Sequence, residues 1–86
     1  METKKELMEW IEKRLEQVTQ EENELAEYLD FVCRNEKTAF EMLDIENPLD
    51  QKYYYDSLLA QRRGMNWVIN NLRNQLIILR GGEIND

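Results

Sequence analysis

Apolar residues recur at alternating intervals of three and four along most of the chain. Before residue 47 these positions hold Met8, Ile11, Leu15, Val18, Leu25, Leu29, Val32, Ala39 and Leu43. After it they hold Tyr55, Leu58, Met65, Ile69, Leu72, Leu76 and Leu79. This spacing is typical of helices that pack through a heptad a/d stripe. Asn47-Pro48 separates the two stretches, as a helix cap followed by a proline suited to the first helical position.

The pattern predicts an all-α protein, a coiled-coil-like antiparallel helical hairpin in a single domain over residues 1–86. The expected elements are a helix over about 3–46, a turn at 46–48, a helix over about 48–80 and a tail at 81–86 that begins with two glycines. The stretch from Thr19 to Glu22 has a capping-box pattern. The first helix therefore either continues through this point or breaks near 18–20, so that the N-terminal part folds back, or swaps between chains, as a third helix.

Facing residues of an antiparallel pair have a constant sum of residue numbers. A register that pairs Val32 with Met65 satisfies both apolar stripes and places Glu36 opposite Arg62, which predicts a buried ion pair between them. The same register leaves the residues before about 16 beyond the end of the second helix. The exposed apolar patch so formed is predicted to be an interface, and it contains Leu7, Met8, Trp10, Ile11 and Leu15.

The second helix has a further face on the side away from its apolar stripe. This outer face consists of Tyr53, Ser57, Ala60, Gly64, Trp67, Asn71 and Ile78. Its small residues would allow another helix to approach closely, with Tyr53, Ala60, Gly64 and Trp67 as predicted contacts. Either residues 3–17 of the same chain or a second copy of the chain could cover it.

Charge and composition narrow the possible functions. The net charge of −7 argues against nonspecific binding to nucleic acid or to an anionic membrane, and no apolar run approaches the length of a membrane span. Histidine is absent, and so are phosphate loops and zinc patterns; we therefore expect no metal, no cofactor and no catalytic residue. The single cysteine, Cys33, and the lack of an apolar leader favour a cytoplasmic location.

Two charged groups are candidate binding features. An acidic face formed by Glu21, Glu24, Glu27 and Asp30 could imitate the phosphates of a nucleic acid, although most such faces are only solvated. Tyr54, Arg63 and Arg73 could hold an anion such as a nucleotide between subunits, unless the arginines meet the acids of the first helix.

The leading hypothesis is a non-enzymatic, acidic helical protein that forms a dimer or higher homo-oligomer and acts by binding another macromolecule, a protein of unknown identity. Its small size, acidity and lack of catalytic motifs resemble those of accessory proteins from phages and other mobile elements, which work in the host cytoplasm. The first alternative is an inhibitor that mimics nucleic acid. The second is an oligomer that sequesters an anionic small molecule.

Overall fold

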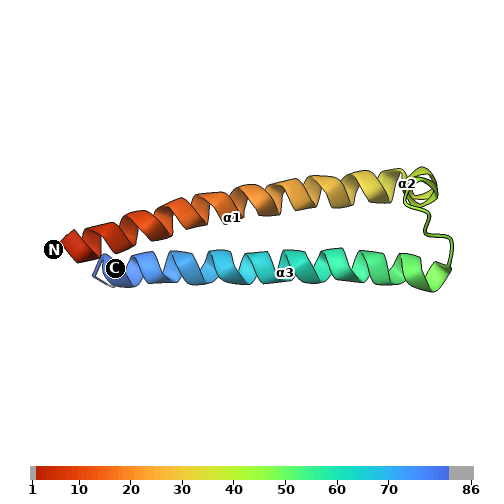
Figure 1. Ribbon diagram of the computed structural model, residues 1–86. Coiled ribbons are helices and arrows are strands. Elements are labelled where there is room, and N and C mark those ends of the chain that lie inside the picture. Colours follow the sequence, from red (N-terminus) through yellow and green to blue (C-terminus); the bar gives the residue numbers. More distant parts are fainter. Residues whose placement is uncertain (1, 82–86) are drawn as a thin grey trace.

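The computed structural model describes residues 2–81, which form three helices (Figure 1). These are α1 (Glu2–Arg34), α2 (Glu36–Met42) and α3 (Pro48–Leu79). The two long helices lie side by side in opposite directions, and α2 is turned across one end of the pair. The result is a rod of 56 × 23 × 17 Å, and the predicted all-α antiparallel hairpin is confirmed.

The first helix differs from its predicted bounds. It runs without interruption through Thr19, so the N-terminal residues continue α1 instead of forming a separate helix. It ends at Arg34, not near residue 46, because Asn35 leaves the helical conformation with φ −123° and ψ 39°. The Asn35 side-chain amide donates to the carbonyl oxygen of Phe31 at 2.9 Å, a local bond of the kind that competes with helix continuation.

The connection between the long helices contains α2 and the residues that follow it. Asp44 has a positive φ of 61°, a conformation that short polar side chains tolerate better than most. Asn47 then caps α3 by accepting a hydrogen bond from the Leu49 amide at 2.8 Å, with Pro48 at the first helical position, as the sequence predicts. At the other end Gly81 has φ 105°, which a glycine adopts without strain, and it stops the helix as expected.

The predicted register between the two long helices is wrong by two heptads, as an ion pair and a buried cluster between them show. Arg62 Nε donates to Glu22 Oε2 at 2.7 Å, so the predicted Glu36–Arg62 ion pair does not form. Glu22 lies fourteen residues before Glu36. Likewise Leu72 shares a buried cluster with Ile11, close to the start of α1. The shift arises because α1 ends at Arg34 and residues 35–47 form α2 and the connection across the end of the rod, so that α3 packs along residues of α1 that lie earlier in the sequence.

The core is a line of apolar side chains between α1 and α3, extended by α2. Its buried members are Ile11, Val18, Leu29, Val32, Ala39, Phe40, Leu58, Ile69, Leu72 and Leu76. Val32 is the most deeply buried, with no exposed surface. All but Phe40 of these residues occupy the a or d positions that the sequence predicts, so the heptad pattern identifies the packed faces correctly even though it misplaces the register.

Aromatic rings close the end of the rod that carries α2. Phe40 meets Tyr54 and Tyr55 edge to face, with ring centroids 5.9 and 5.5 Å apart. The Tyr55 hydroxyl donates to Glu36 Oε2 at 2.7 Å. Burial, and then this bond to a carboxylate, raise the pKa of Tyr55 far above its usual range. Glu36 thus has a structural partner at the tip of the hairpin in place of Arg62.

Candidate interaction surfaces

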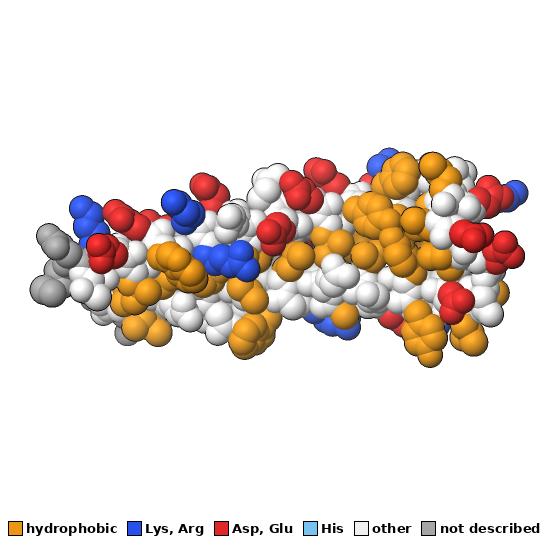
Figure 2. All heavy atoms as spheres, viewed as in Figure 1, with side chains coloured by type: hydrophobic (Ala, Val, Ile, Leu, Met, Phe, Trp, Pro, Cys, Tyr) orange, Lys and Arg blue, Asp and Glu red, His pale blue; other side chains and the backbone are white. Residues whose placement is uncertain are grey.

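The outer face of α3 is exposed, and from Tyr53 to Trp67 it lies on the side of the helix away from α1; Ile78, near its end, lines a pocket with Leu7 and Ile11 of α1. Six of its seven residues are exposed and Asn71 is half-buried. Tyr53 keeps 69% and Trp67 68% of their surface accessible, so neither ring packs inside the hairpin. Figure 2 shows apolar side chains that protrude along the α3 edge of the rod. Large aromatic side chains in water are a common sign of an interaction site, particularly when they share one face of one helix.

Gly64 lies near the middle of this face. Glycine inside a helix costs about 1 kcal/mol relative to alanine. A methyl group placed on Gly64 would meet nothing within 4 Å, so packing within the hairpin does not require a glycine here. The predicted cover by residues 3–17 is also excluded, because these residues belong to α1 and contact α3 through its opposite side. From Tyr53 to Trp67 the outer face is therefore uncovered within residues 2–81.

The predicted N-terminal interface is largely taken up by the core. Ile11 is 4% exposed, and Met8 and Leu15 pack against the cluster that it forms with Leu72 and Leu76. This part of the prediction is wrong, and the cause is the register, which had placed these residues beyond the end of the second helix. Leu7 and Trp10 do remain exposed, the latter at 65%. Leu7 lies at the edge of the helix pair, where it lines a pocket with Ile78 and Leu79 of α3.

Some of the exposed apolar side chains were not among the predicted contacts, including Leu49, Phe31 and Met42. Leu49 extends the outer face of α3 by one turn, Phe31 lies on α1 and Met42 ends α2. Phe31 follows Trp10 by three heptads, so the heptad pattern alone places both on the same side of α1. The position of Met42 could not be found in this way, because it depends on the turn at Asn35.

Several carboxylates lie on the exposed side of α1. The predicted acidic face is present, and its members Glu21, Glu24, Glu27 and Asp30 are all exposed. Asp30 forms an ion pair with Arg34 at 2.7 Å, and Glu24 accepts a hydrogen bond from the Gln20 amide at 3.0 Å. Within residues 2–81 the carboxylates of Glu21, Glu24 and Glu27 make no salt bridge. Acidic side chains line the α1 edge in Figure 2, which leaves a negative surface open to solvent.

The three residues proposed for anion binding do not converge in one hairpin. Tyr54 and Arg73 are nineteen residues apart on a straight helix, which separates them by about 28 Å. The hydroxyl of Tyr54 is hydrogen-bonded to that of Tyr28, and this bond, with burial, raises the pKa of Tyr54 to about 12. Arg63 lies between the other two, on the exposed side of α3. A single anion cannot contact all three within one chain.

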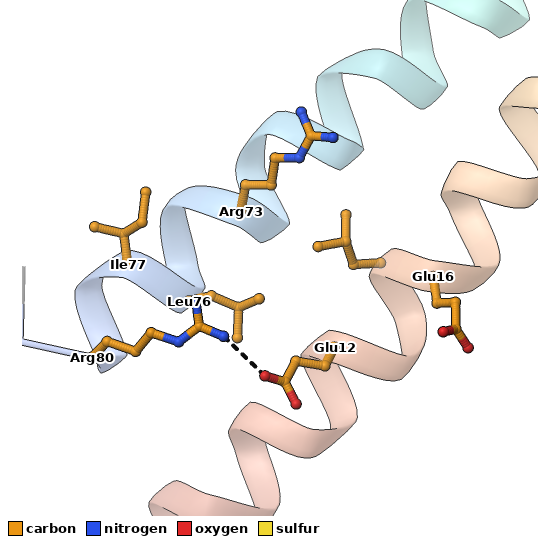
Figure 3. A pocket seen from close by; sticks show the side chains of 7 residues that line it. Glu12, Glu16, Arg73, Leu76, Ile77 and Arg80 are labelled. Carbon is orange, nitrogen blue, oxygen red and sulfur yellow. Dashed lines mark hydrogen bonds and ion pairs between the residues drawn. The ribbon is translucent and has the colours of Figure 1, made fainter.

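A pocket of about 480 Å³ opens between α1 and the end of α3 (Figure 3). Its lining residues are Glu12, Leu15, Glu16, Arg73, Leu76, Ile77 and Arg80. Arg80 donates to Glu12 across the opening at 2.9 Å, and Figure 3 shows Arg73 extending away from this pair. Two carboxylates offset two guanidinium groups, so the pocket has an apolar floor and a charged rim without a strong preference for anions.

The described chain offers little chemistry beyond these surfaces. In residues 2–81 no three metal-ligating side chains gather closely enough to hold an ion. None of the three helices combines the length and apolar composition that a bilayer span requires. Cys33 is a free, exposed thiol. No protein-family model matches the chain, and neither does any curated protein or solved structure.

Proposed function

We propose that the protein is a non-enzymatic helical protein that self-associates through the outer face of α3 and acts by binding another macromolecule. The observation that carries the proposal is the pair of exposed aromatic rings on that face, Tyr53 and Trp67, on either side of a glycine that the hairpin does not need. Burial of two such rings against another helix would remove a large apolar area from water.

The charge distribution supports different roles for the two long helices, with α3 in self-association and α1 in binding a different partner. The outer face of α3 contains no charged residue, whereas the exposed side of α1 carries a line of carboxylates with Trp10 near its start. Interfaces between copies of one chain are commonly depleted of charge at their centre. The uncharged outer face therefore suits a second copy, and the acidic side of α1 suits a different, basic partner.

Sedimentation equilibrium tests the first half of this proposal. The wild-type chain should associate, and Trp67→Lys should weaken the association by about 100-fold, because the lysine removes an aromatic contact and introduces a charge at the interface. Trp10→Lys is the matched control, since Trp10 is equally exposed but lies on α1. A wild-type chain that stays monomeric at millimolar concentration, or equal losses in the two variants, would contradict the proposal.

Affinity capture tests the second half. A triple variant, Glu24→Lys, Glu27→Lys and Asp30→Lys, reverses the charge of the acidic face at positions exposed to solvent, so the hairpin should still fold. A partner held by this face should be retained by the wild-type chain and lost from the variant at the same salt concentration. Circular dichroism should give the same helix content for both. Retention by the variant would place the partner on another surface.

The alternative role as a nucleic-acid mimic draws on the same carboxylates. Glu21, Glu24 and Glu27 make no salt bridge within the described residues, so their charge is free to meet the basic groove of a nucleic-acid-binding enzyme. If this is the role, competition should weaken steeply as salt increases. An inhibitory activity that is unchanged in the triple lysine variant would rule it out.

A further inference from the structure

The outer face of α3 has a residue pattern that complements itself when the helix is reversed. From this we infer that its occupant is the same face of a second copy, packed antiparallel across a two-fold axis that passes between Ser57 and Ala60. The inference rests on the self-association proposed above and specifies its symmetry and register. The observations that support it are the exposure of the face, the order of large and small side chains along it, and the charges on its flank.

Small side chains lie where the two helices would be closest. The outer face occupies the c and f heptad positions, roughly 150° around α3 from the packed a and d positions. With the axis at residue 58.5, Ser57 of one copy lies beside Ala60 of the other, in two equivalent contacts. Both are exposed in the hairpin, so their small size is not required by packing against α1. It would let two α3 helices approach closely.

The same register gives each large ring a place. Tyr53 lies opposite Gly64 of the second copy, because each is 5.5 residues from the axis. A glycine leaves room for a ring to pack against the helix backbone, which explains a glycine that no intrachain contact requires. Trp67 reaches the first turn of the other α3, where Leu49 is 65% exposed. In this register each large apolar side chain of the face between residues 49 and 67 has a contact in the second copy.

Charges on one flank also match in this register. Asp56 and Arg63 both occupy b positions, beside the outer face, and both are exposed. In this register Arg63 of one copy lies two residues, or about 3 Å along the helix, from the position opposite Asp56 of the other. This offset is within reach of the long Arg63 side chain, which gives two symmetric attractive pairs. Asp56 also forms an exposed pair with Lys52 of its own helix at 2.9 Å, which is compatible with a second cation nearby. Within residues 2–81 Arg63 makes no salt bridge.

A parallel arrangement would remove these relations. The residues of the outer face would then lie beside their own copies, whereas the b positions that hold Asp56 and Arg63 would face the opposite flank of the partner, the g positions. Between residues 54 and 68 these g positions hold no charged residue. The attractive pairs between Asp56 and Arg63 would therefore be lost. Tyr53 would also meet Tyr53, and Gly64 would leave an unfilled gap. The antiparallel orientation is therefore the one in which both charge and size are complementary.

Charge reversal tests the register in the 86-residue chain. Arg63→Asp leaves two acids on the flank, and Asp56→Arg leaves two bases. Each variant alone should dimerise about tenfold more weakly than wild type, since both cross-pairs become repulsive. A mixture of the two variants should form a heterodimer with restored affinity, because every acid then faces a base. Unchanged affinity in the single variants, or no gain on mixing, would overturn the register.

Cross-linking provides a second and independent measurement. In a Cys33→Ser background, Ala60→Cys and Asn74→Cys place a thiol at equivalent heptad positions that are both exposed. A short bismaleimide should link two copies at position 60, close to the axis. It should not link them at position 74, where the two thiols would be about 46 Å apart along the helices. Linkage at both positions would indicate a parallel dimer and contradict the inference.

The failure of this inference can be distinguished from the failure of the proposed function. A wild-type chain that is monomeric by sedimentation would contradict both. A chain that dimerises and is weakened by Trp67→Lys, but is indifferent to the charge reversals, would keep the outer face as the interface and exclude the antiparallel register. Restored heterodimerisation together with cross-linking only at position 60 would support both.

Discussion

Replacing Arg62 by leucine should destabilise the hairpin by about 2 kcal/mol, the middle of the range for a buried acceptor that loses its partner. The Glu22 side chain is 12% exposed, so it cannot recover its full hydration when the guanidinium is removed. The full cost of breaking a deeply buried pair, about 3–5 kcal/mol, does not apply, because Arg62 is 44% exposed and the pair is partly screened by water.

The converse substitution should behave differently. Glu22→Leu leaves a guanidinium that can turn into solvent, and it adds an apolar side chain at a core heptad position. We expect a change of less than about 0.5 kcal/mol. The double variant should be at least as stable as wild type, since no unpaired charge is left. Adding Glu36→Leu to Arg62→Leu should not restore the lost stability, because Glu36 accepts a hydrogen bond from Tyr55 and does not pair with Arg62.

Urea unfolding followed by circular dichroism measures these differences. Adding Trp67→Lys to every chain weakens the proposed self-association, and a low protein concentration then keeps dissociation from contributing to the free energy of unfolding. The midpoints should shift at constant m value. Equal destabilisation by Arg62→Leu alone and by Arg62→Leu with Glu22→Leu would refute the reasoning, and rescue by Glu36→Leu would restore the register that the sequence first suggested.

Three other expected outcomes can be checked by the same unfolding assay. Val32→Ala removes two methyl groups from a side chain with no exposed surface and should cost about 2–3 kcal/mol, whereas a loss below 1 kcal/mol would mean that this part of the core is loosely packed. Asn47→Ala removes the cap on the Leu49 amide and should cost about 1 kcal/mol, with no change expected if the cap is frayed in solution. The pKa of Tyr54 is raised in the folded chain, so the unfolded chain loses this proton at a lower pH; the contribution of Tyr54 to the free energy of unfolding should be fully present below pH 10 and should fall as the pH rises towards 12. Tyr28→Phe should make this fall smaller, because it removes the hydroxyl that bonds to Tyr54. An identical pH profile in that variant would exclude the hydroxyl pair as the cause.

The heptad pattern predicts the two packed faces but cannot fix how far one helix is displaced along the other. Registers that differ by two heptads place the same kinds of residue opposite one another, and both Glu22 and Glu36 occupy the a positions of their stripe. Only the length of the connection distinguishes the two registers. That length depends on Asn35, which ends α1 without help from glycine or proline. Ala39 keeps the periodicity inside α2, so no gap in the pattern marks the turn.

The candidate surfaces that lie on a single helix could be predicted from the sequence, whereas those that depend on the register between the helices could not. The outer face of α3 follows from heptad positions on one helix, and all of it except Asn71 is exposed as expected. The acidic face follows in the same way. The N-terminal patch was inferred from an overhang that the wrong register created, and Met8, Ile11 and Leu15 pack into the core instead. Tyr54 and Arg73 were grouped by chemistry alone, which a straight helix keeps apart.

The geometry of α3 connects the two halves of the proposed function. Because its outer face points away from α1 between Tyr53 and Trp67, two hairpins joined through that face form a flat layer of four helices with an α1 at each edge. With neighbouring helices spaced at 8–10 Å, the two α1 helices are about 25–30 Å apart. Both acidic faces then remain open to solvent and run in opposite directions. A partner with two basic sites at that separation binds both edges at once, and the second contact forms at high effective concentration. Under this proposal self-association would strengthen partner binding without contributing a residue to it, so that Trp67→Lys should weaken an interaction made by carboxylates on α1.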